Sequence, residues 1–111
     1  MANDRHRDIR AAVFSTLDYN FGSIPREEGL VLLSKGLEDH AARVRQYSVE
    51  CVEFNIDHLP NSLILKALEV HRELCRSSNW YISYFATMSF DDFEVKVKSK
   101  IALEQQKTLL S

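Results

Sequence analysis

One spacing of residues occurs at three places along the chain, and it restricts the fold more than any other feature. In residues 39–52, DHAARVRQYSVECV, an acidic residue is followed five positions later by Val-Arg, then by a small residue and an aliphatic one. Shifts of 35 and then 38 residues align three segments on this pattern. The aligned positions are Ile9, Val44 and Ile82; Val13, Ser48 and Ala86; and Leu17, Val52 and Phe90. Such an internal period is typical of stacked helical units.

The similarity extends to residues that start and stop helices. Asp4, Asp39 and Ser77 each stand five positions before the leading aliphatic residue, where a short polar side chain can cap a helix. Pro25 and Pro60 fall together under the shift of 35, and proline suits the first turn of a helix because its missing N–H is not needed there. Each unit is therefore expected to be a pair of antiparallel helices.

Helix is expected along the whole chain, since 111 residues contain only three glycines and two prolines. Six helical segments can be placed. The last, DDFEVKVKSKIALEQQKTLL, is ambiguous, because Phe93, Val95 and Val97 alternate as in a strand. No partner strand is apparent elsewhere, which favours helix. The prediction is a single all-α domain, residues 1–111, of three helix pairs at about residues 1–37, 38–76 and 77–111.

Each pair has more apolar surface than it can bury alone. Phe14, Val49 and Phe85 lie beside the main stripe, where a neighbouring unit could cover them. The second helix of the middle unit, SLILKALEVHRELC, is the most apolar, as expected for a unit that is covered on two sides. The pattern therefore predicts a stack of pairs with one continuous core.

The pattern Asp-x4-Val-Arg-x2-small-x3-aliphatic resembles the first helix of HEAT and armadillo repeats. Residues 39–52 match it best, residues 4–17 moderately, and residues 77–90 poorly because Ser83 replaces the arginine. The resemblance covers most of the chain. It implies an α–α superhelix whose second helices line a concave surface, and a protein-binding scaffold more often than a nucleic-acid-binding one.

The resemblance also implies roles for three polar residues. In the family, the Asp and Arg of the first helices often pair between units. Arg10, Arg45 and Asp39 are therefore expected to be structural, with no part in binding or catalysis.

The candidate catalytic and metal sites have simpler structural explanations. His71 and Cys75 are four residues apart and could share a metal ion, but zinc normally needs three or four protein ligands. Both residues, like Cys51, lie on stripes expected to be buried. The acid pairs Glu27-Glu28 and Asp91-Asp92 suit helix starts, and no phosphate-binding, hydrolase or metalloprotease motif is present. We expect no enzyme activity, no catalytic residue, no bound metal and no cofactor.

The charge pattern gives the alternative function. Basic residues gather near the N-terminus and at residues 96–100, namely Arg5, His6, Arg7, Arg10, Lys96, Lys98 and Lys100. Nucleic-acid binding through these clusters is the second hypothesis. Interleaved acids and a net charge of −2 disfavour it.

The location is expected to be cytoplasmic. The N-terminal sequence MANDRHRDIR is charged where a signal peptide needs an apolar run. No apolar stretch approaches the roughly 20 residues that span a bilayer, and two cysteines do not make a disulfide framework. We therefore expect no membrane association and reduced thiols.

The segment NWYISYF, residues 79–85, is the strongest candidate binding site. The repeat register directs Ile82 and Phe85 inward and leaves Trp80, Tyr81 and Tyr84 for a partner. A polar rim is expected on the outward side of the second helices, at Lys35, Lys66, Glu69, Glu73 and Arg76. The predicted function is binding of another protein, as an inhibitor, an adaptor or a toxin-neutralising immunity protein.

Overall fold

The computed structural model describes residues 2–110, with side chains described for residues 6–17, 20–107 and 109. The elements, in order, are α1 (Ala2–Asn20), the 3-10 turn η1 (Phe21–Ser23), α2 (Arg26–Leu37), α3 (Ala42–Phe54), the 3-10 turn η2 (Ile56–His58), α4 (Asn61–Leu74) and α5 (Trp80–Leu110). The described residues contain helices and turns but no strand, so the all-α prediction is confirmed. Asp4 and Arg5, predicted as a cap and as part of a basic cluster, lie outside the residues whose side chains are described.

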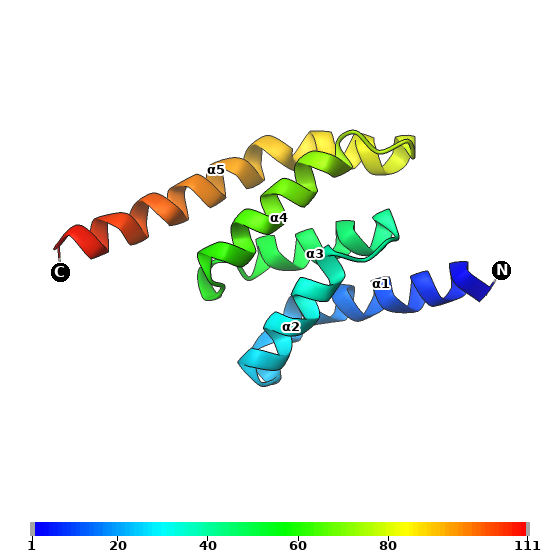
Figure 1. Cartoon of the computed structure of the whole chain (residues 1–111), viewed down its shortest axis with the longest axis horizontal. Helices are drawn as coiled ribbons and strands as arrows, with labels where there is room; N and C mark the ends of the chain where they lie inside the picture. The colour runs from blue at the N-terminus through cyan, green and yellow to red at the C-terminus, as the bar shows by residue number, and fades with distance from the viewer. Residues whose placement is uncertain (1, 111) are drawn as a thin grey trace.

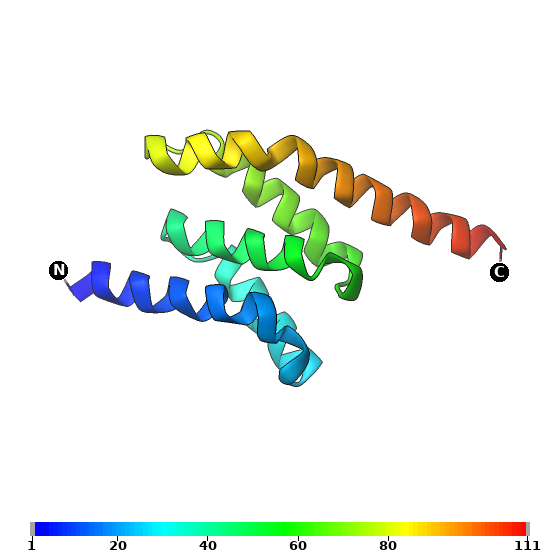
Figure 2. The same ribbon diagram turned by 180° about the vertical axis from the view of Figure 1, so that it is seen from behind.

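The helices form two layers. Helices α1, α3 and α5 run side by side in the same direction, and α2 and α4 return across them (Figure 1). From behind, α1, α3 and α5 form the near layer (Figure 2). Helix α3 packs against α1, α2, α4 and α5 and is the centre of the molecule, which measures 55 × 31 × 19 Å.

The connections within the first two helix pairs have the same construction. The turns η1 and η2 begin 35 residues apart, and Pro25 and Pro60 each occupy the N-cap position of the helix that follows. In both pairs the residue before the proline has an extended backbone, as the proline ring requires. The same local signal therefore makes the same helix–turn–helix connection twice.

The prediction of a sixth helix is wrong. Residues 80–110 form one continuous helix of 31 residues, and Asp91-Asp92 lie in its interior instead of at a helix start. No glycine or proline interrupts this segment, so the helix continues. The ambiguous residues 91–98 are helical, with Phe93 and Val97 buried and Val95 exposed. The described chain thus contains two helix pairs followed by one long helix.

The predicted buried stripe of the first helix is wrong at two of three positions. Ile9 and Val13 are 57% and 45% exposed, whereas Leu17 is buried. Their counterparts in α3, Val44 and Ser48, are fully buried. The difference follows from position in the stack, because α3 is covered by α1 and α2, whereas no described element packs on the outer side of α1.

Gly36 allows α1, α2 and α3 to meet closely. A Cβ at this position would lie 2.1 Å from Ser48 Oγ and 2.4 Å from Cζ of Phe14. On the same side of α2, Leu33 and Leu37 are almost completely buried. Only a hydrogen atom fits at this crossing, so the residue type is set by packing and not by backbone conformation.

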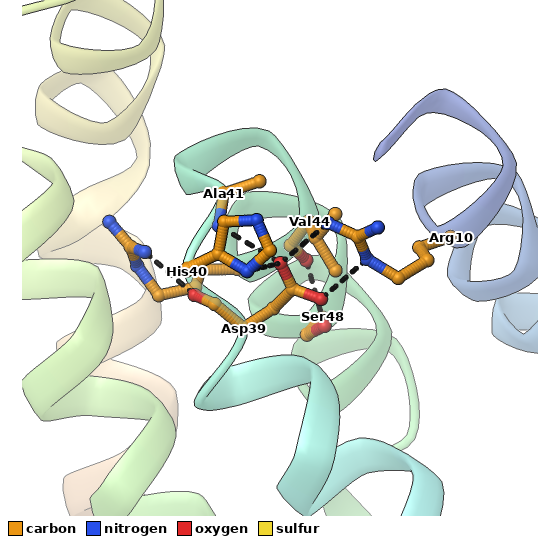
Figure 3. Close-up of polar contacts among 7 residues, drawn as sticks. Arg10, Asp39, His40, Ala41, Val44 and Ser48 are labelled. Atoms are coloured by element: carbon orange, nitrogen blue, oxygen red, sulfur yellow. Dashed lines mark hydrogen bonds and ion pairs between the residues drawn. The ribbon is translucent and has the colours of Figure 1, made fainter. Parts of the chain in front are cut away.

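Asp39 joins the first pair to the second (Figure 3). Its carboxylate accepts hydrogen bonds from Arg10 Nε at 2.7 Å, from Arg10 Nη2 at 3.1 Å and from the Ala41 N–H at 2.9 Å. Its carbonyl oxygen accepts a hydrogen bond from Arg45 at 2.7 Å. The N-cap of α3 is Ala41, so Asp39 does not cap the helix as predicted. The expected pairing of Asp39 with an arginine of the preceding unit is present.

The environment of Asp39 keeps its carboxylate ionised. Partial burial alone would raise the pKa of this carboxyl, but the hydrogen bonds from Arg10 and Ala41 outweigh burial and hold its pKa below the usual value. The ionised form is therefore the one that the folded state stabilises.

We expect Gly36→Ala to lower the free energy of unfolding by about 1–3 kcal/mol, because the added methyl group overpacks the crossing. Urea denaturation monitored by circular dichroism measures the change. Gly22→Ala is the matched control, since a Cβ at Gly22 meets no atom within 4 Å, and it should leave stability unchanged or slightly higher. Equal losses for the two variants would contradict this account of the crossing.

We expect Asp39→Asn to lower the free energy of unfolding by about 1–3 kcal/mol at pH 7, because charge-assisted hydrogen bonds are lost. The contribution of the Asp39 carboxylate to the free energy of unfolding is present above its unfolded-state pKa of about 3.9. This contribution disappears as the pH falls below that value. The difference between the two proteins should therefore shrink in acid. In urea denaturation, Arg10→Gln combined with Asp39→Asn should cost less than the sum of the single changes.

Asp91→Asn, at an exposed carboxylate of α5, is the control and should change stability little. Additive effects of the Arg10 and Asp39 substitutions would show that the two side chains are not coupled.

Candidate protein interface

The first turns of α5 expose a cluster of large apolar side chains, here called the aromatic cluster. Trp80 is 75% exposed and Met88 62%, and the other three members are between 42% and 55% exposed. The members are Trp80, Tyr81, Tyr84, Phe85 and Met88. A concentration of this kind on a helix surface is typical of a binding site.

Helical periodicity explains why these side chains face outward. The buried residues Ile82, Ala86, Phe93 and Val97 share the face of α5 that packs on the other helices. At 3.6 residues per turn, the aromatic cluster falls on the opposite face. The cluster thus points away from the core because Ile82, Ala86, Phe93 and Val97 already occupy the core face of α5.

The start of α5 is held by a side chain that the sequence did not single out. Asn79 Oδ1 accepts hydrogen bonds from the N–H groups of Tyr81 at 3.0 Å and Ile82 at 3.3 Å. The predicted cap at Ser77 is therefore wrong. Ser77 Oγ instead accepts a hydrogen bond from the N–H of Asn79 at 3.2 Å, which orders the turn before the helix.

The aromatic rings contact one another. Tyr81 lies 4.7 Å from Phe85 between ring centroids, and Tyr84 meets Phe85 edge-to-face at 5.4 Å. Trp80 meets Tyr81 edge-to-face at 5.9 Å. These are favourable ring geometries, and they limit the conformations of exposed side chains before any partner arrives.

Two members of the aromatic cluster were not predicted. Phe85 was expected to face inward, but it is 42% exposed and contacts Tyr81 and Tyr84 at the surface. Met88 was overlooked, although it lies four residues after Tyr84 and seven after Tyr81. That spacing places it on the same helix face and could have identified it.

The predicted polar rim lies on other helices. Lys35, Glu69, Glu73 and Arg76 are exposed, as predicted, but they lie on α2, on α4 and in the turn after α4. Lys66 pairs with Glu38 and lies 3.2 Å from Ser34 Oγ, so it ties α4 to α2. Only Arg76, four residues before Trp80, adjoins the aromatic cluster along the chain.

The basic residues of the second cluster are paired with acids. Lys96 lies 3.1 Å from Glu53, Lys98 lies 3.7 Å from Glu94, and Lys100 lies 3.0 Å from Glu104. Near the N-terminus, Arg7 lies 3.6 Å from Asp8, and Arg10 is held by Asp39. The described members of both clusters, apart from the exposed His6, therefore have a carboxylate beside them.

His71 is a buried core residue, as predicted. Its Nε2 lies 2.8 Å from the carbonyl oxygen of Ala86, and its ring stacks on Phe93 and meets Phe90 edge-on. Burial lowers the pKa of His71, and the hydrogen bond to Ala86 and the charge of Glu53 offset this only in part. The imidazole is thus neutral and donates its Nε2 proton to Ala86.

Neither thiol belongs to a metal-binding group of side chains in the described part of the chain. Cys51 is fully buried and Cys75 half-buried. Within the described part of the chain, no three or more His, Cys, Asp or Glu residues group where they could hold a metal ion. His71 and Cys75 therefore remain an isolated pair with too few additional ligands for zinc.

Comparison with known proteins gives no relative. The chain matches no protein-family model, no curated protein and no solved structure. Among the described helices, none combines the length and the apolar character that crossing a lipid bilayer requires. The chemistry of the exposed surfaces is consequently the basis for any functional proposal.

We expect the neutral state of His71 to make stability depend on pH. A histidine with a lowered pKa in the folded state contributes fully above its unfolded-state pKa of about 6.5, and its contribution falls as the pH drops below that value. The free energy of unfolding should decrease by up to about 1.4 kcal/mol per pH unit below 6.5, and His71→Gln should remove this pH dependence.

Urea denaturation between pH 7.5 and 5.5 measures the slope of the free energy of unfolding against pH. His58→Gln, at an exposed histidine, is the control, and equal slopes for His71→Gln and wild type would contradict a buried neutral imidazole.

Proposed function

We propose that this chain is a non-catalytic protein-binding module that binds its partner through the aromatic cluster of α5. The observation that carries the proposal is the exposure of Trp80, Tyr81, Tyr84, Phe85 and Met88 on the face of α5 opposite the core. Soluble proteins rarely expose a contiguous apolar patch without a function for it. Trp and Tyr are enriched at binding hot spots, because they bury a large area and retain a polar group.

The ring contacts also favour binding. Ordering flexible side chains at an interface costs about 0.5–1.5 kcal/mol each. Tyr81 and Tyr84 both rest against Phe85, so part of that ordering is achieved in the free protein. A partner with an apolar surface and a few hydrogen-bonding groups for the tyrosine hydroxyls would complement this face.

We further propose that the scaffold is a HEAT-like stack. Three observations support this: the two-layer arrangement of parallel α1, α3 and α5 with α2 and α4 (Figure 1), the matched turns 35 residues apart, and the Arg10–Asp39 pair between units. In this proposal α5 takes the place of the third unit. Inhibitor, adaptor and toxin-immunity roles all suit such a binder, and a chain with only two cysteines, too few for a disulfide framework, suits the cytoplasm.

Nucleic-acid binding is the less favoured function. Binding to a phosphate backbone needs lysine and arginine side chains that can neutralise the phosphates and so release the counterions condensed on the nucleic acid. In this chain Lys96, Lys98 and Lys100 each lie beside a glutamate. Neutralised lysines and an overall charge of −2 support a protein partner instead.

We expect Trp80→Ala combined with Tyr84→Ala to reduce capture of the dominant protein partner at least tenfold in a pull-down from the native cell, because removing two hot-spot residues costs more than about 1.4 kcal/mol. The thermal midpoint should stay the same, since both side chains are largely exposed. Leu65→Ala, at an exposed leucine of α4, is the control and should retain the partner.

The opposite result is equally specific. If the double variant keeps its protein partner, or if the wild type instead shifts a DNA or RNA duplex at low salt and releases it steeply as salt rises, the aromatic cluster is not the functional surface.

A further inference from the structure

The other end of the stack has an apolar groove between α1 and α2. It has a volume of about 550 Å³ and is lined mainly by apolar side chains. Ile9, Val13 and Leu32 are 57%, 45% and 38% exposed in it, and Leu17 and Ile24 form its floor. None of these residues belongs to the aromatic cluster, so the groove is a separate surface.

The internal 35-residue offset identifies the same surface in the next pair, where it is covered. The residues that correspond to those of the groove are Val44, Ser48, Val52, Leu59 and Ala67. All five are at most 2% exposed. A surface that is bare on the first pair is therefore completely buried on the second.

Helices α1 and α2 together cover this surface on the second pair, and α2 packs against both of its helices, α3 and α4. Gly36 of α2 abuts Ser48. Ser34 of α2 and Glu38, the residue that follows α2, also contact Lys66, the neighbour of Ala67. The groove between α1 and α2 therefore corresponds, by the 35-residue offset, to a surface over which α2 packs on the second pair.

The chemistry of the groove argues against a plain solvent-facing end. A helix pair that leaves one face to the solvent normally makes that face polar, which keeps the protein soluble. In this chain the exposed surface is instead the more apolar of the two. Val13 corresponds to the buried Ser48, and Leu32 corresponds to the buried and smaller Ala67. The open end carries more hydrocarbon than the covered one.

We propose that this groove binds one amphipathic α-helix of a partner protein, in the position that α2 holds over α3 and α4. The inference rests on the proposed function of the chain as a protein binder and adds a second surface with a defined ligand. The helix presents apolar side chains at positions i, i+3, i+4 and i+7 to Val13, Leu17 and Leu32.

Charge defines the ligand further. Glu27 and Glu28 line the continuation of the groove beside Val31 and Leu32, and both are exposed. A helix with Lys or Arg at this end is favoured by their carboxylates. The α2 helix of a second copy would bring its own Glu27 and Glu28 to the same place, so like charges oppose self-association through α2.

The test uses helical peptides derived from α2 and the full chain. One stapled peptide, residues 25–38, keeps Glu27 and Glu28, and the other carries Glu27→Lys and Glu28→Lys. Fluorescence anisotropy of the labelled peptides should show saturable binding, at least tenfold tighter for the lysine peptide. In the chain, Ile9→Asp and Val13→Asp should each weaken binding at least tenfold, and Glu27→Gln with Glu28→Gln should remove the preference for lysine.

Controls separate this surface from the aromatic cluster. Val95→Asp on α5 and Trp80→Ala should leave peptide binding unchanged, and circular dichroism checks that every variant is folded. Loss of the native partner with retained peptide binding in Trp80→Ala is the expected result, and it would support two separate binding surfaces. Three results overturn the inference: no saturable binding of the lysine peptide, equal binding by Val13→Asp and wild type, or self-association in sedimentation velocity that Val13→Asp abolishes, which would assign the groove to a second copy.

Discussion

The close packing around α3 is the constraint on which the rest of the structure depends. This helix contacts all four others, and Val44, Ser48, Cys51 and Val52 have no exposed surface. Such packing requires small groups where helices cross, which is why Ser48 meets a glycine of α2. Most of the large apolar side chains that remain exposed among the described residues lie at the two ends of the stack, on α1, α2 and α5, whereas Phe54 of α3 and Leu65 of α4 are exceptions. Both proposed binding surfaces are found at these ends, on the outer sides of α1–α2 and of α5.

Polar contacts determine how the pairs are joined. Asp39 links α1 to the turn before α3, Lys66 links α4 to α2, and His71 donates to a carbonyl of α5. Each contact lies at a junction between elements, and each involves partners far apart in sequence. Their main effect is to fix the relative position of helices that apolar packing alone would allow to slide. Asp39, Lys66 and His71 therefore have structural roles, although side chains of these types can also bind ligands or catalyse reactions. The lysines near residue 100 likewise pair with glutamates.

The two exposed surfaces differ in ways that suggest different ligands. The aromatic cluster is a convex surface, because it consists of large side chains on one face of a single helix. It is suited to insertion into an apolar surface of a partner. The groove of α1 and α2 is concave and aliphatic, with Glu27 and Glu28 at one end, and it suits a single basic amphipathic helix. A chain with both could bring two protein surfaces together, which is the behaviour expected of an adaptor.

The sequence by itself determined the helices, the two proline-initiated connections and the burial of His71, because these depend on residues close together in the chain or on a strong apolar periodicity. It also indicated Trp80, Tyr81 and Tyr84 as exposed. Only the tertiary structure decided that Ile9 and Val13 are bare while their counterparts are buried, since a stripe records which face is apolar and not whether a neighbour covers it. The continuity of α5 was available from the sequence, because no glycine or proline interrupts residues 80–110, but Asp91-Asp92 wrongly indicated a helix start. Burial of one helix by another depends on contacts between residues far apart in the chain, and those contacts form only when the whole stack is assembled.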